Sequence, residues 1–162
     1  MKIGVYPGTF DPITNGHLDI IRRSFRVFDK VIIAVAPNPK KAPLFDIHDR
    51  VDMIKEATHD LSYVEIEIFE GLLAEYMKRK GVHAIIRGVR AISDFEHEFL
   101  MALVNRKLDT ECETFFLMPS EEYAYTTSSA IKEVASYGGE LNDLVPPHVA
   151  ARLKEKFGKP DK

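Results

Sequence analysis

A short polar segment with the residue types of a phosphate-binding turn begins at position 8 of this chain. Gly8 and Thr9 directly follow an apolar run, and Gly16 and His17 stand where a helical pattern begins. The free N–H groups and the positive end of a helix favour phosphate, and glycine lets the backbone approach an anion closely. His17, in the first turn, can donate a hydrogen bond to the same anion. The segment GTFDPITNGH therefore predicts a phosphate-binding site.

His17 by itself has a plainer interpretation, because a lone histidine near a helix start is more often a capping or solvent-facing residue. The TxGH sequence, which opens a helix shortly after a Gly-Thr turn, favours phosphate contact instead. The chain contains no GxxxxGKS or GxxxxGKT sequence, which excludes a Walker-type P-loop.

Four cations, Lys40, Lys41, Arg87 and Arg90, could form a positive rim on this mildly acidic protein. A triphosphate and a second phosphate monoester both need such groups, since arginine can hold two oxygens and lysine acts as a point charge. Paired lysines in a loop are, however, usually solvated surface. Their spacing alone is therefore weak evidence for a site.

Arg87 is a stronger signal because it ends an apolar strand pattern, AIIR, where burying an unpaired guanidinium would be costly. Two kinds of partner remain open. Arg87 could meet a ligand anion, or it could form a salt bridge with a carboxylate such as Asp94 or Glu98.

Four hydroxyl residues, TTSS, precede the helical pattern AIKEVA. One of them would act as an N-cap, which is the ordinary explanation for hydroxyls at this place. Four hydroxyls exceed what a cap needs. The surplus predicts a second anion-binding turn at the start of this helix.

Five short runs rich in valine, isoleucine and phenylalanine alternate with helical patterns, at residues 3–6, 31–36, 64–69, 84–87 and 114–118. This alternation predicts an α/β fold: a doubly wound, Rossmann-like, five-stranded parallel sheet with helices on both faces. The apolar runs VIIAVA and FFLM fit strands covered on both faces, whereas the alternating VEIEIF fits a strand near an edge.

Apolar residues at spacings of three and four predict the buried face of each helix. Helix by helix, they are Leu18, Ile21, Phe25 and Phe28; Ile47, Val51 and Ile54; Leu72, Leu73, Tyr76 and Met77, before Gly81; Phe95, Phe99 and Leu103; and Ile131, Val134 and Ala135, before Gly138 and Gly139. Ser93 and Glu96 predict a capping box at the fourth helix. A last helix is expected over residues 146–157, ended by Gly158 and Pro160.

The polar segments all follow strands: GTFDPITNGH the first, PNPKKAP the second, RGVRAISD the fourth and PSEEYAYTTSS the fifth. Carboxyl ends of parallel strands lie at one edge of a sheet, where open α/β folds bind ligands. We therefore expect a single site, built from segments that are distant in sequence.

Length and composition predict one domain over residues 1–162, with 45% hydrophobic and 29% charged residues. A net charge of −3, with both signs interspersed, argues against a nucleic-acid partner. Cys112 is the sole cysteine, which excludes an intrachain disulfide, and no Cys/His cluster suggests a structural metal. Because the N-terminus lacks a long apolar run, we expect no signal peptide or membrane span, and a cytoplasmic protein.

In order and spacing, GTFDPITNGH, IIRGVRAISDFEHE and PSEEYAYTTSSAIKEVA resemble the bacterial phosphopantetheine adenylyltransferases, a family of the nucleotidyltransferase superfamily. The similarity covers nearly the whole chain. TxGH alone marks the wider superfamily, whereas RGVRAISDFE is much more specific to this family.

The resemblance implies that ATP and 4'-phosphopantetheine are substrates, that the products are dephospho-coenzyme A and pyrophosphate, and that Mg²⁺ accompanies ATP. It implies catalytic roles for His17, Lys41, Thr9 and Arg90. ATP contacts are implied for Thr9, Phe10, His17, Gly88, Val89, Arg90, Glu98, Tyr123, Ala124, Tyr125, Thr126, Thr127, Ser128 and Ser129, and phosphopantetheine contacts for Thr9, Lys41, Leu73 and Arg87. Leu73 is also open to plain core packing, because it lies at helical spacing from Met77.

Feedback binding of coenzyme A and a homohexamer are implied by the family only. The chain departs from the family pattern at three positions. Members usually have an apolar residue and a serine where this chain has Thr126 and Thr127, and often a tyrosine at His97. The resemblance therefore leaves open whether residue 126 packs against adenine.

The expected reaction is in-line attack by the 4'-phosphate on the α-phosphorus of ATP, without a covalent enzyme intermediate. The attacking phosphate is already ionised at neutral pH, so catalysis consists of positioning two anions and stabilising charge on the α-phosphoryl oxygens. His17 and Lys41 would stabilise that charge, while Thr9 orients and Arg87 holds the acceptor. Few carboxylates occur in the motifs, so Mg²⁺ should be held mainly by phosphates and water.

Three other functions compete with this hypothesis. The nearest is a nucleotidylyltransferase that uses CTP or a nicotinamide mononucleotide acceptor, because the phosphate site would be shared. A non-catalytic nucleotide-binding domain would bind ATP without releasing pyrophosphate. A purely structural Rossmann-like module is disfavoured by the concentration of glycines, cations and hydroxyls after the strands.

Overall fold

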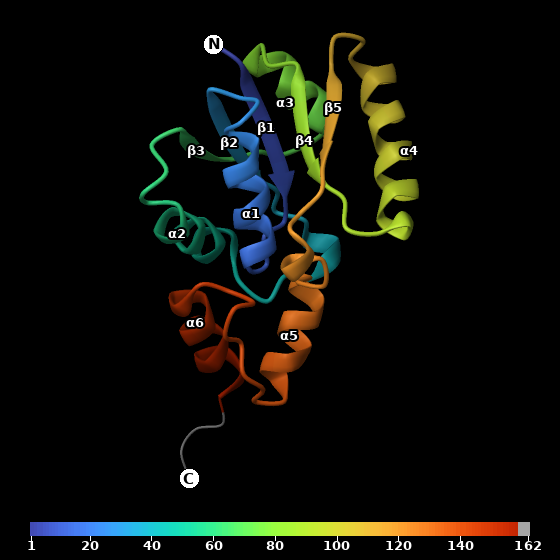
Figure 1. Ribbon diagram of the computed structural model, residues 1–162. Helices are drawn as coiled ribbons and strands as arrows, with labels where there is room; N and C mark the ends of the chain where they lie inside the picture. Colours follow the sequence, from blue (N-terminus) through green and yellow to red (C-terminus); the bar gives the residue numbers. More distant parts are fainter. Residues whose placement is uncertain (159–162) are drawn as a thin grey trace.

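A five-stranded parallel sheet forms the centre of the computed structural model, which describes residues 1–158 (Figure 1). Its strands lie in the order β3-β2-β1-β4-β5 and pair in parallel throughout. They are β1 (Ile3–Gly8), β2 (Lys30–Val35), β3 (Val64–Ile68), β4 (Ala84–Gly88) and β5 (Glu113–Leu117). The expected fold class is confirmed, and β3 lies at an edge as its alternating pattern predicted. Between β1 and β4 the direction of strand addition reverses, which creates a crevice at the carboxyl ends.

Six helices accompany the sheet: α1 (Asn15–Ser24), α2 (Ile47–Ala57), α3 (Leu73–Lys80), α4 (Ile92–Leu108), α5 (Ser128–Ser136) and α6 (Pro147–Phe157), with 3-10 turns η1 (Pro39–Lys41) and η2 (Glu121–Tyr123). Helices α5 and α6 lie together beyond the carboxyl edge of the sheet (Figure 1). Gly158 caps α6. The predicted stop at Pro160 and the predicted domain end at residue 162 lie outside the described residues.

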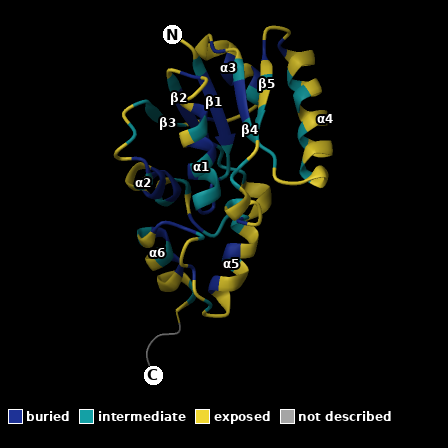
Figure 2. Cartoon of the chain, in the orientation of Figure 1, coloured by how far each residue is buried: buried dark blue, intermediate teal, exposed yellow. Residues whose placement is uncertain are grey.

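The two faces of the sheet pack against different helices because neighbouring strand residues point to opposite sides. Tyr6 and Ile33 belong to an apolar cluster with α1, α2, α5 and α6, whereas Val5 and Ile32 belong to a second cluster with α3. Figure 2 shows β1 and β2 as the most deeply buried part of the molecule. Helices on both faces, as the sequence predicted, therefore hold the central strands in place.

Some residues predicted to face inward are exposed. Phe25 lies just beyond α1, which ends at Ser24, and its ring stacks on Tyr63 at the surface, 4.3 Å between centroids. Leu72 precedes the first turn of α3 and is exposed. Val134 lies on the outer flank of α5. These predictions were wrong because helical spacing extended each stripe to a position that the neighbouring element does not cover.

The prediction for α4 was wrong in two respects. The helix begins at Ile92 with Ala91 as N-cap and no side-chain cap, so Ser93 and Glu96 do not form a capping box. The apolar residues Phe95, Phe99 and Leu103 are 43 to 48% exposed, and no residue of α4 is buried. The helix packs against α3 and edge strand β5, and its apolar face extends beyond both. Phe115 of the FFLM run is likewise half-exposed, so the expected cover on both faces of this strand is incomplete. An apolar stripe indicates that a face is suited to burial, and here no element within residues 1–158 covers it fully.

No helix within residues 1–158 is long and apolar enough to span a membrane.

Candidate active site

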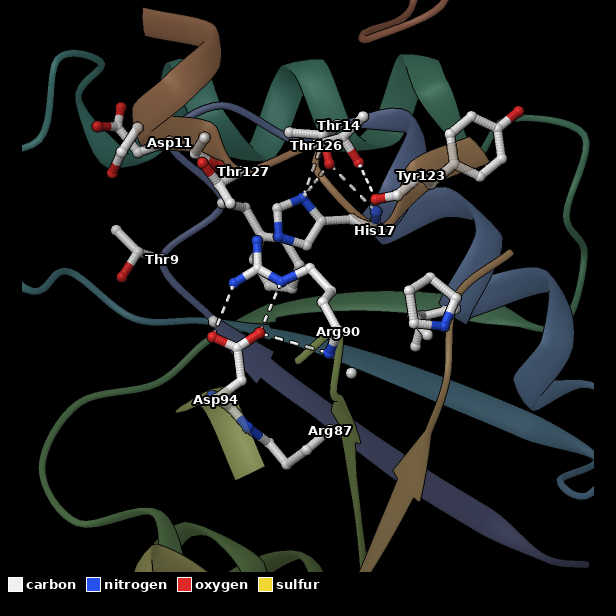
Figure 3. A pocket seen from close by; sticks show the side chains of 18 of the residues that line it. Thr9, Asp11, Thr14, His17, Arg87, Arg90, Asp94, Tyr123, Thr126 and Thr127 are labelled. Atoms are coloured by element: carbon white, nitrogen blue, oxygen red, sulfur yellow. Dashed lines mark hydrogen bonds and ion pairs between the residues drawn. The ribbon is translucent and has the colours of Figure 1, made fainter. Parts of the chain in front are cut away.

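The loops after β1, β4 and β5 surround a cavity of about 660 Å³ at the carboxyl edge of the sheet, and Lys41 of the loop after β2 also lines it. We call it the large cavity (Figure 3). His17, Lys41 and Arg87 all line it, as do Thr9, Phe10, Gly88, Arg90 and Glu98. The four polar segments of the sequence thus meet in one place, as expected for segments that follow the carboxyl ends of parallel strands.

His17 is held by the cap of α1. Its backbone N–H donates to Thr14 Oγ1 at 3.2 Å, and its ring Nδ1 accepts from the backbone N–H of Thr14 at 3.0 Å. This reciprocal bonding places the ring proton on Nε2. Burial lowers the pKa of His17 to about 3, and the charges of Arg90 and Arg87 act in the same direction. His17 is therefore a neutral ring that caps the helix through one nitrogen and keeps an N–H donor on the other.

Thr9 and Phe10 form the turn after β1. The Thr9 hydroxyl accepts a hydrogen bond from Asn38 Nδ2 at 2.9 Å, so its own proton remains available for a ligand. Phe10 is buried with a positive φ of 48°, and its ring packs edge-on against Tyr6 and His17. One side of the His17 ring is therefore covered by Phe10 and Tyr6.

Arg87 is paired with Glu98, one of the two kinds of partner that the sequence left open. Its Nε and Nη2 donate to the two carboxylate oxygens at 2.6 and 2.5 Å, and Nη1 donates to the carbonyl of Pro7 at 2.7 Å. Burial disfavours the charge on Arg87, but the hydrogen bonds to Glu98 outweigh it and raise the pKa of the guanidinium. Arg87 is thus a fixed cation whose plane is set by the carboxylate.

Arg90 forms a looser pair. Its Nε donates to Asp94 Oδ2 at 3.0 Å across one turn at the start of α4, and both side chains are about one-third exposed (Figure 3). A solvated pair of this kind contributes little to stability. Arg90 is therefore free to redirect its charge toward an anion in the large cavity.

The loop before α5 divides between cavity wall and surface. Tyr123, Thr126, Thr127, Ser128 and Ser129 line the large cavity, whereas Ala124 and Tyr125 do not. Tyr125 is exposed. Val89 also lies outside the cavity wall, where its N–H extends the β4–β5 ladder by donating to Leu117.

Three of the four hydroxyls of the TTSS sequence, which runs into the first turn of α5, have structural partners. Thr127 caps the helix by accepting from Ala130 N, and Ser128 donates to the carbonyl of Pro12 at 2.8 Å. Thr126 is buried and donates to the carbonyl of Tyr123. The hydroxyls that suggested an anion-binding turn therefore have structural roles too, and Ser128 holds this segment against the turn after β1.

Gly8 and Gly16 lack side chains for a reason the sequence did not reveal. A Cβ on Gly16 would collide with the Thr126 hydroxyl, and a Cβ on Gly8 would lie 2.9 Å from the Phe10 ring. Close packing inside the site, rather than close approach of a ligand, is what the structure demonstrates at both positions. The Thr126 side chain thus packs directly against Gly16 at the start of α1.

A second cavity of about 290 Å³, the small cavity, adjoins the large one. Thr9, Lys41 and Arg87 line both. Leu73 lines only the small cavity, together with Phe69, and it also packs on the apolar cluster under α3. Both interpretations of Leu73 are therefore consistent with its position. The junction is polar and charged, since Glu98 lines both cavities together with Lys41 and its partner Arg87. The wall formed by Phe69 and Leu73 is apolar.

Several residues at the site were missed by sequence reasoning. Asp11 is buried, and its carboxylate accepts from the backbone N–H groups of Leu44 and Phe45 and from Lys132 Nζ. Lys132 lies on α5 without any distinguishing context in the sequence. Arg50 is buried in the apolar stripe of α2, between Ile47 and Val51, and this interruption was the one readable signal.

Comparison with known proteins gives consistent matches along the whole chain. A family model described as cytidylyltransferase-like matches residues 5–134. A phosphopantetheine adenylyltransferase of Caldanaerobacter subterraneus subsp. tengcongensis is 54% identical over 98% of this chain and 99% of its own length. One of Carboxydothermus hydrogenoformans is 56% identical over 98% of both.

Among solved structures, a Vibrio parahaemolyticus protein described as a nicotinate-nucleotide adenylyltransferase superposes with a TM-score of 0.70 over 98% of both chains. The two sequences are 16% identical. At that identity the comparison establishes a shared fold and nothing more specific.

We expect the imidazole of His17 in the ligand-free protein to stay neutral between about pH 8 and about pH 5, with its proton on Nε2. Nitrogen-15 NMR of the ring measures this, and His17→Gln identifies the resonance. The pKa of His17 is lowered from 6.5 to about 3 in the folded protein, so below pH 6.5 the unfolded chain binds a proton that the folded protein does not. The free energy of unfolding therefore falls as the pH drops from 6.5 to about 3. A ring that gains its second proton near pH 6.5 would contradict the capping geometry.

Proposed function

The chain belongs to the phosphopantetheine adenylyltransferase family, and we propose on that premise that it transfers AMP from ATP to 4'-phosphopantetheine. The products are dephospho-coenzyme A and pyrophosphate. The observation that supports this assignment is the junction of two cavities at Thr9, Lys41 and Arg87. A reaction between two phosphate compounds needs such a shared cationic point, with separate room for the remainder of each substrate.

The two cavities suit different substrates. The large cavity, which the loops after β4 and β5 line, offers polar groups and helix N-termini for a nucleoside triphosphate. The small cavity offers Phe69 and Leu73 as an apolar wall for the pantetheine arm. We therefore place ATP in the large cavity and the acceptor in the small one, with the acceptor phosphate at the junction.

In the reaction, an oxygen of the 4'-phosphate forms a bond to the α-phosphorus. The bond from the α-phosphorus to its bridging oxygen breaks, and pyrophosphate leaves with that electron pair. No proton has to be removed from the ionised attacking phosphate. His17 donates its Nε2 hydrogen bond to the α-phosphoryl oxygens, and Lys41 supplies positive charge beside them. Neutral His17 acts as a donor and does not transfer its proton.

Arg87 can hold the acceptor phosphate without leaving Glu98. A guanidinium has five N–H donors. Glu98 and the carbonyl of Pro7 engage three of them in the structure, so two remain for phosphate oxygens. Thr9 adds a hydroxyl donor that Asn38 orients. Arg90 and Ser129 are left for the triphosphate.

We propose that Mg²⁺ enters with ATP. The carboxylates in the wall of the large cavity, Asp11, Asp94 and Glu98, are each paired with a cation. Within residues 1–158 no cluster of three metal-ligating side chains occurs. These residues do not fit a protein cage for the ion, so triphosphate and water would hold it. Its contribution would be to neutralise phosphate charge.

Location, regulation and assembly are further parts of the proposal. We place the protein in the cytoplasm, where ATP is available. Coenzyme A contains the product's pantetheine and adenylate groups and would compete for the same two cavities. We also propose a homo-oligomer, a hexamer by family membership, supported by the exposed apolar residues of α4, such as Phe99 and Leu100.

The assignment is tested by incubating the protein with ATP, Mg²⁺ and 4'-phosphopantetheine and detecting dephospho-coenzyme A by mass. We expect stoichiometric pyrophosphate, and His17→Ala should lower turnover by at least about a hundredfold at a temperature where the variant is still folded. Its melting temperature should fall by a few degrees, because the variant loses the ring that caps α1. CTP and nicotinamide mononucleotide serve as competing substrates. Preferred use of either would establish the rival transferase, and ATP binding without pyrophosphate would establish a non-catalytic domain.

Neighbouring lysines provide a matched pair of variants. Lys41→Ala should raise the KM for phosphopantetheine and lower kcat, because Lys41 lines both cavities. Lys40→Ala removes the adjacent charge from a side chain that lines neither, and steady-state kinetics should not change. Equal losses in the two variants would show that only the net charge of the loop matters.

Assembly is tested by Leu100→Glu, which puts a charge on the apolar surface of α4, where Leu100 is 58% exposed. We expect light scattering after size-exclusion chromatography to show a smaller particle than the wild type. Val27→Glu changes an exposed apolar residue elsewhere on the surface and should leave the particle unchanged. A monomeric wild type would refute the proposal.

A further inference from the structure

Arg50 is a buried cation with an unusual set of partners. The residue is 2% exposed and lies on α2, away from the cavity wall. Its guanidinium donates to five backbone carbonyls, at distances from 2.7 to 3.4 Å: those of Thr9, Ala36, Pro37, Phe45 and Asp46. No ion pair with a carboxylate within 4.0 Å involves Arg50 in the described part of the chain.

Four of these carbonyls come from the two ends of one loop. Residues 36–46 connect β2 to α2 and include Lys41; we call them the β2–α2 loop. Nη1 and Nη2 hold Ala36 and Pro37 at its start, and Nε holds its last two residues. The shortest of the five hydrogen bonds, 2.7 Å from Nη1 to the carbonyl oxygen of Thr9, reaches the turn after β1. One side chain therefore closes the loop and ties it to the turn that carries Thr9.

Other contacts show that this loop must be held from outside. It contains no regular element except the short turn η1, and Asn38 and Ala42 have positive φ values of 46° and 43°. Such conformations persist in residues other than glycine only when surrounding structure enforces them. Asp11 binds the backbone N–H groups of Leu44 and Phe45 on one side, and Arg50 binds the carbonyls on the other.

Stability alone does not account for a charge in this place. A buried guanidinium is costly to desolvate, and well-packed apolar residues of similar volume often stabilise a protein as well or better. Burial lowers the pKa of Arg50, against the opposing charges of Asp11 and Asp46. The geometry of five donors in one plane is what an apolar residue or a lysine cannot reproduce.

We propose that Arg50 is a positioning residue that sets the separation of Thr9 and Lys41 around the acceptor phosphate. This inference rests on the proposed function for the identity of that phosphate. Both residues line the junction of the two cavities, and both are attached to backbone that Arg50 binds. The nucleotide loops after β4 and β5 receive no hydrogen bond from Arg50.

The test is Arg50→Lys, which keeps the charge but loses the planar set of donors, compared with Arg152→Lys. Within residues 1–158, Arg152 pairs with Asp49 of α2 and forms no hydrogen bond or ion pair with the β2–α2 loop, so it controls for the stability of α2. We expect Arg50→Lys to lower kcat/KM for phosphopantetheine by roughly tenfold to a hundredfold, the scale of loss caused by a misplacement of about 1 Å. The dissociation constant for ATP should change far less than this in Arg50→Lys, because Arg90 and the loops after β4 and β5 also line the ATP cavity, and it should not change in Arg152→Lys.

Hydrogen exchange supplies a readout that does not depend on activity. In Arg50→Lys, the amides of Lys41, Ala42, Leu44 and Phe45 should exchange faster, since each is hydrogen-bonded within or to the loop. Unchanged exchange, or equal losses for ATP and phosphopantetheine, would overturn the inference. If wild-type protein makes no dephospho-coenzyme A, the proposed function fails, whereas the exchange result still decides whether Arg50 orders this loop.

Discussion

The reversal of strand order between β1 and β4 is the constraint on which the rest of the structure depends. Chains that leave neighbouring parallel strands toward opposite faces open a crevice between them, and no side chain is needed to create it. In this protein the turn after β1 contributes Thr9 and His17 to one side, and the end of β4 contributes Arg87 to the other. Every polar group of the site is positioned relative to that opening.

Within the crevice, cations are held by carboxylates before any ligand arrives. Arg87 pairs with Glu98, Arg90 with Asp94, and Lys132 with Asp11. Pairing fixes the side chains and offsets their mutual repulsion, and the guanidinium retains N–H donors that point elsewhere. The site therefore presents oriented donors to two phosphate compounds that repel each other. That orientation is the contribution that in-line phosphoryl chemistry requires from a protein.

Several residues combine a structural and a chemical role. His17 closes the cap of α1 through Nδ1 and thereby fixes its proton on Nε2. The hydroxyls before α5 cap a helix and hold a loop, and they still line the large cavity. At such positions the capping and binding interpretations of a sequence motif are not alternatives. One hydrogen bond, from the Thr14 N–H to His17 Nδ1, both closes the cap of α1 and sets the tautomer of His17.

The sequence by itself determined the strands, the parallel α/β class and the convergence of His17, Lys41 and Arg87, because apolar runs and turn residues are local signals and parallel strands end at one edge. Only the tertiary structure decided which carboxylate pairs with Arg87, what excludes a side chain at Gly16, and where Asp11 and Arg50 act. Asp11 binds backbone N–H groups 33 and 34 residues away and Lys132 of a distant helix, and Arg50 joins carbonyls that lie 4 to 41 residues away. The exposed face of α4 marks the same limit: periodicity reports that a surface is apolar, but what covers it depends on contacts that no single stretch of sequence encodes.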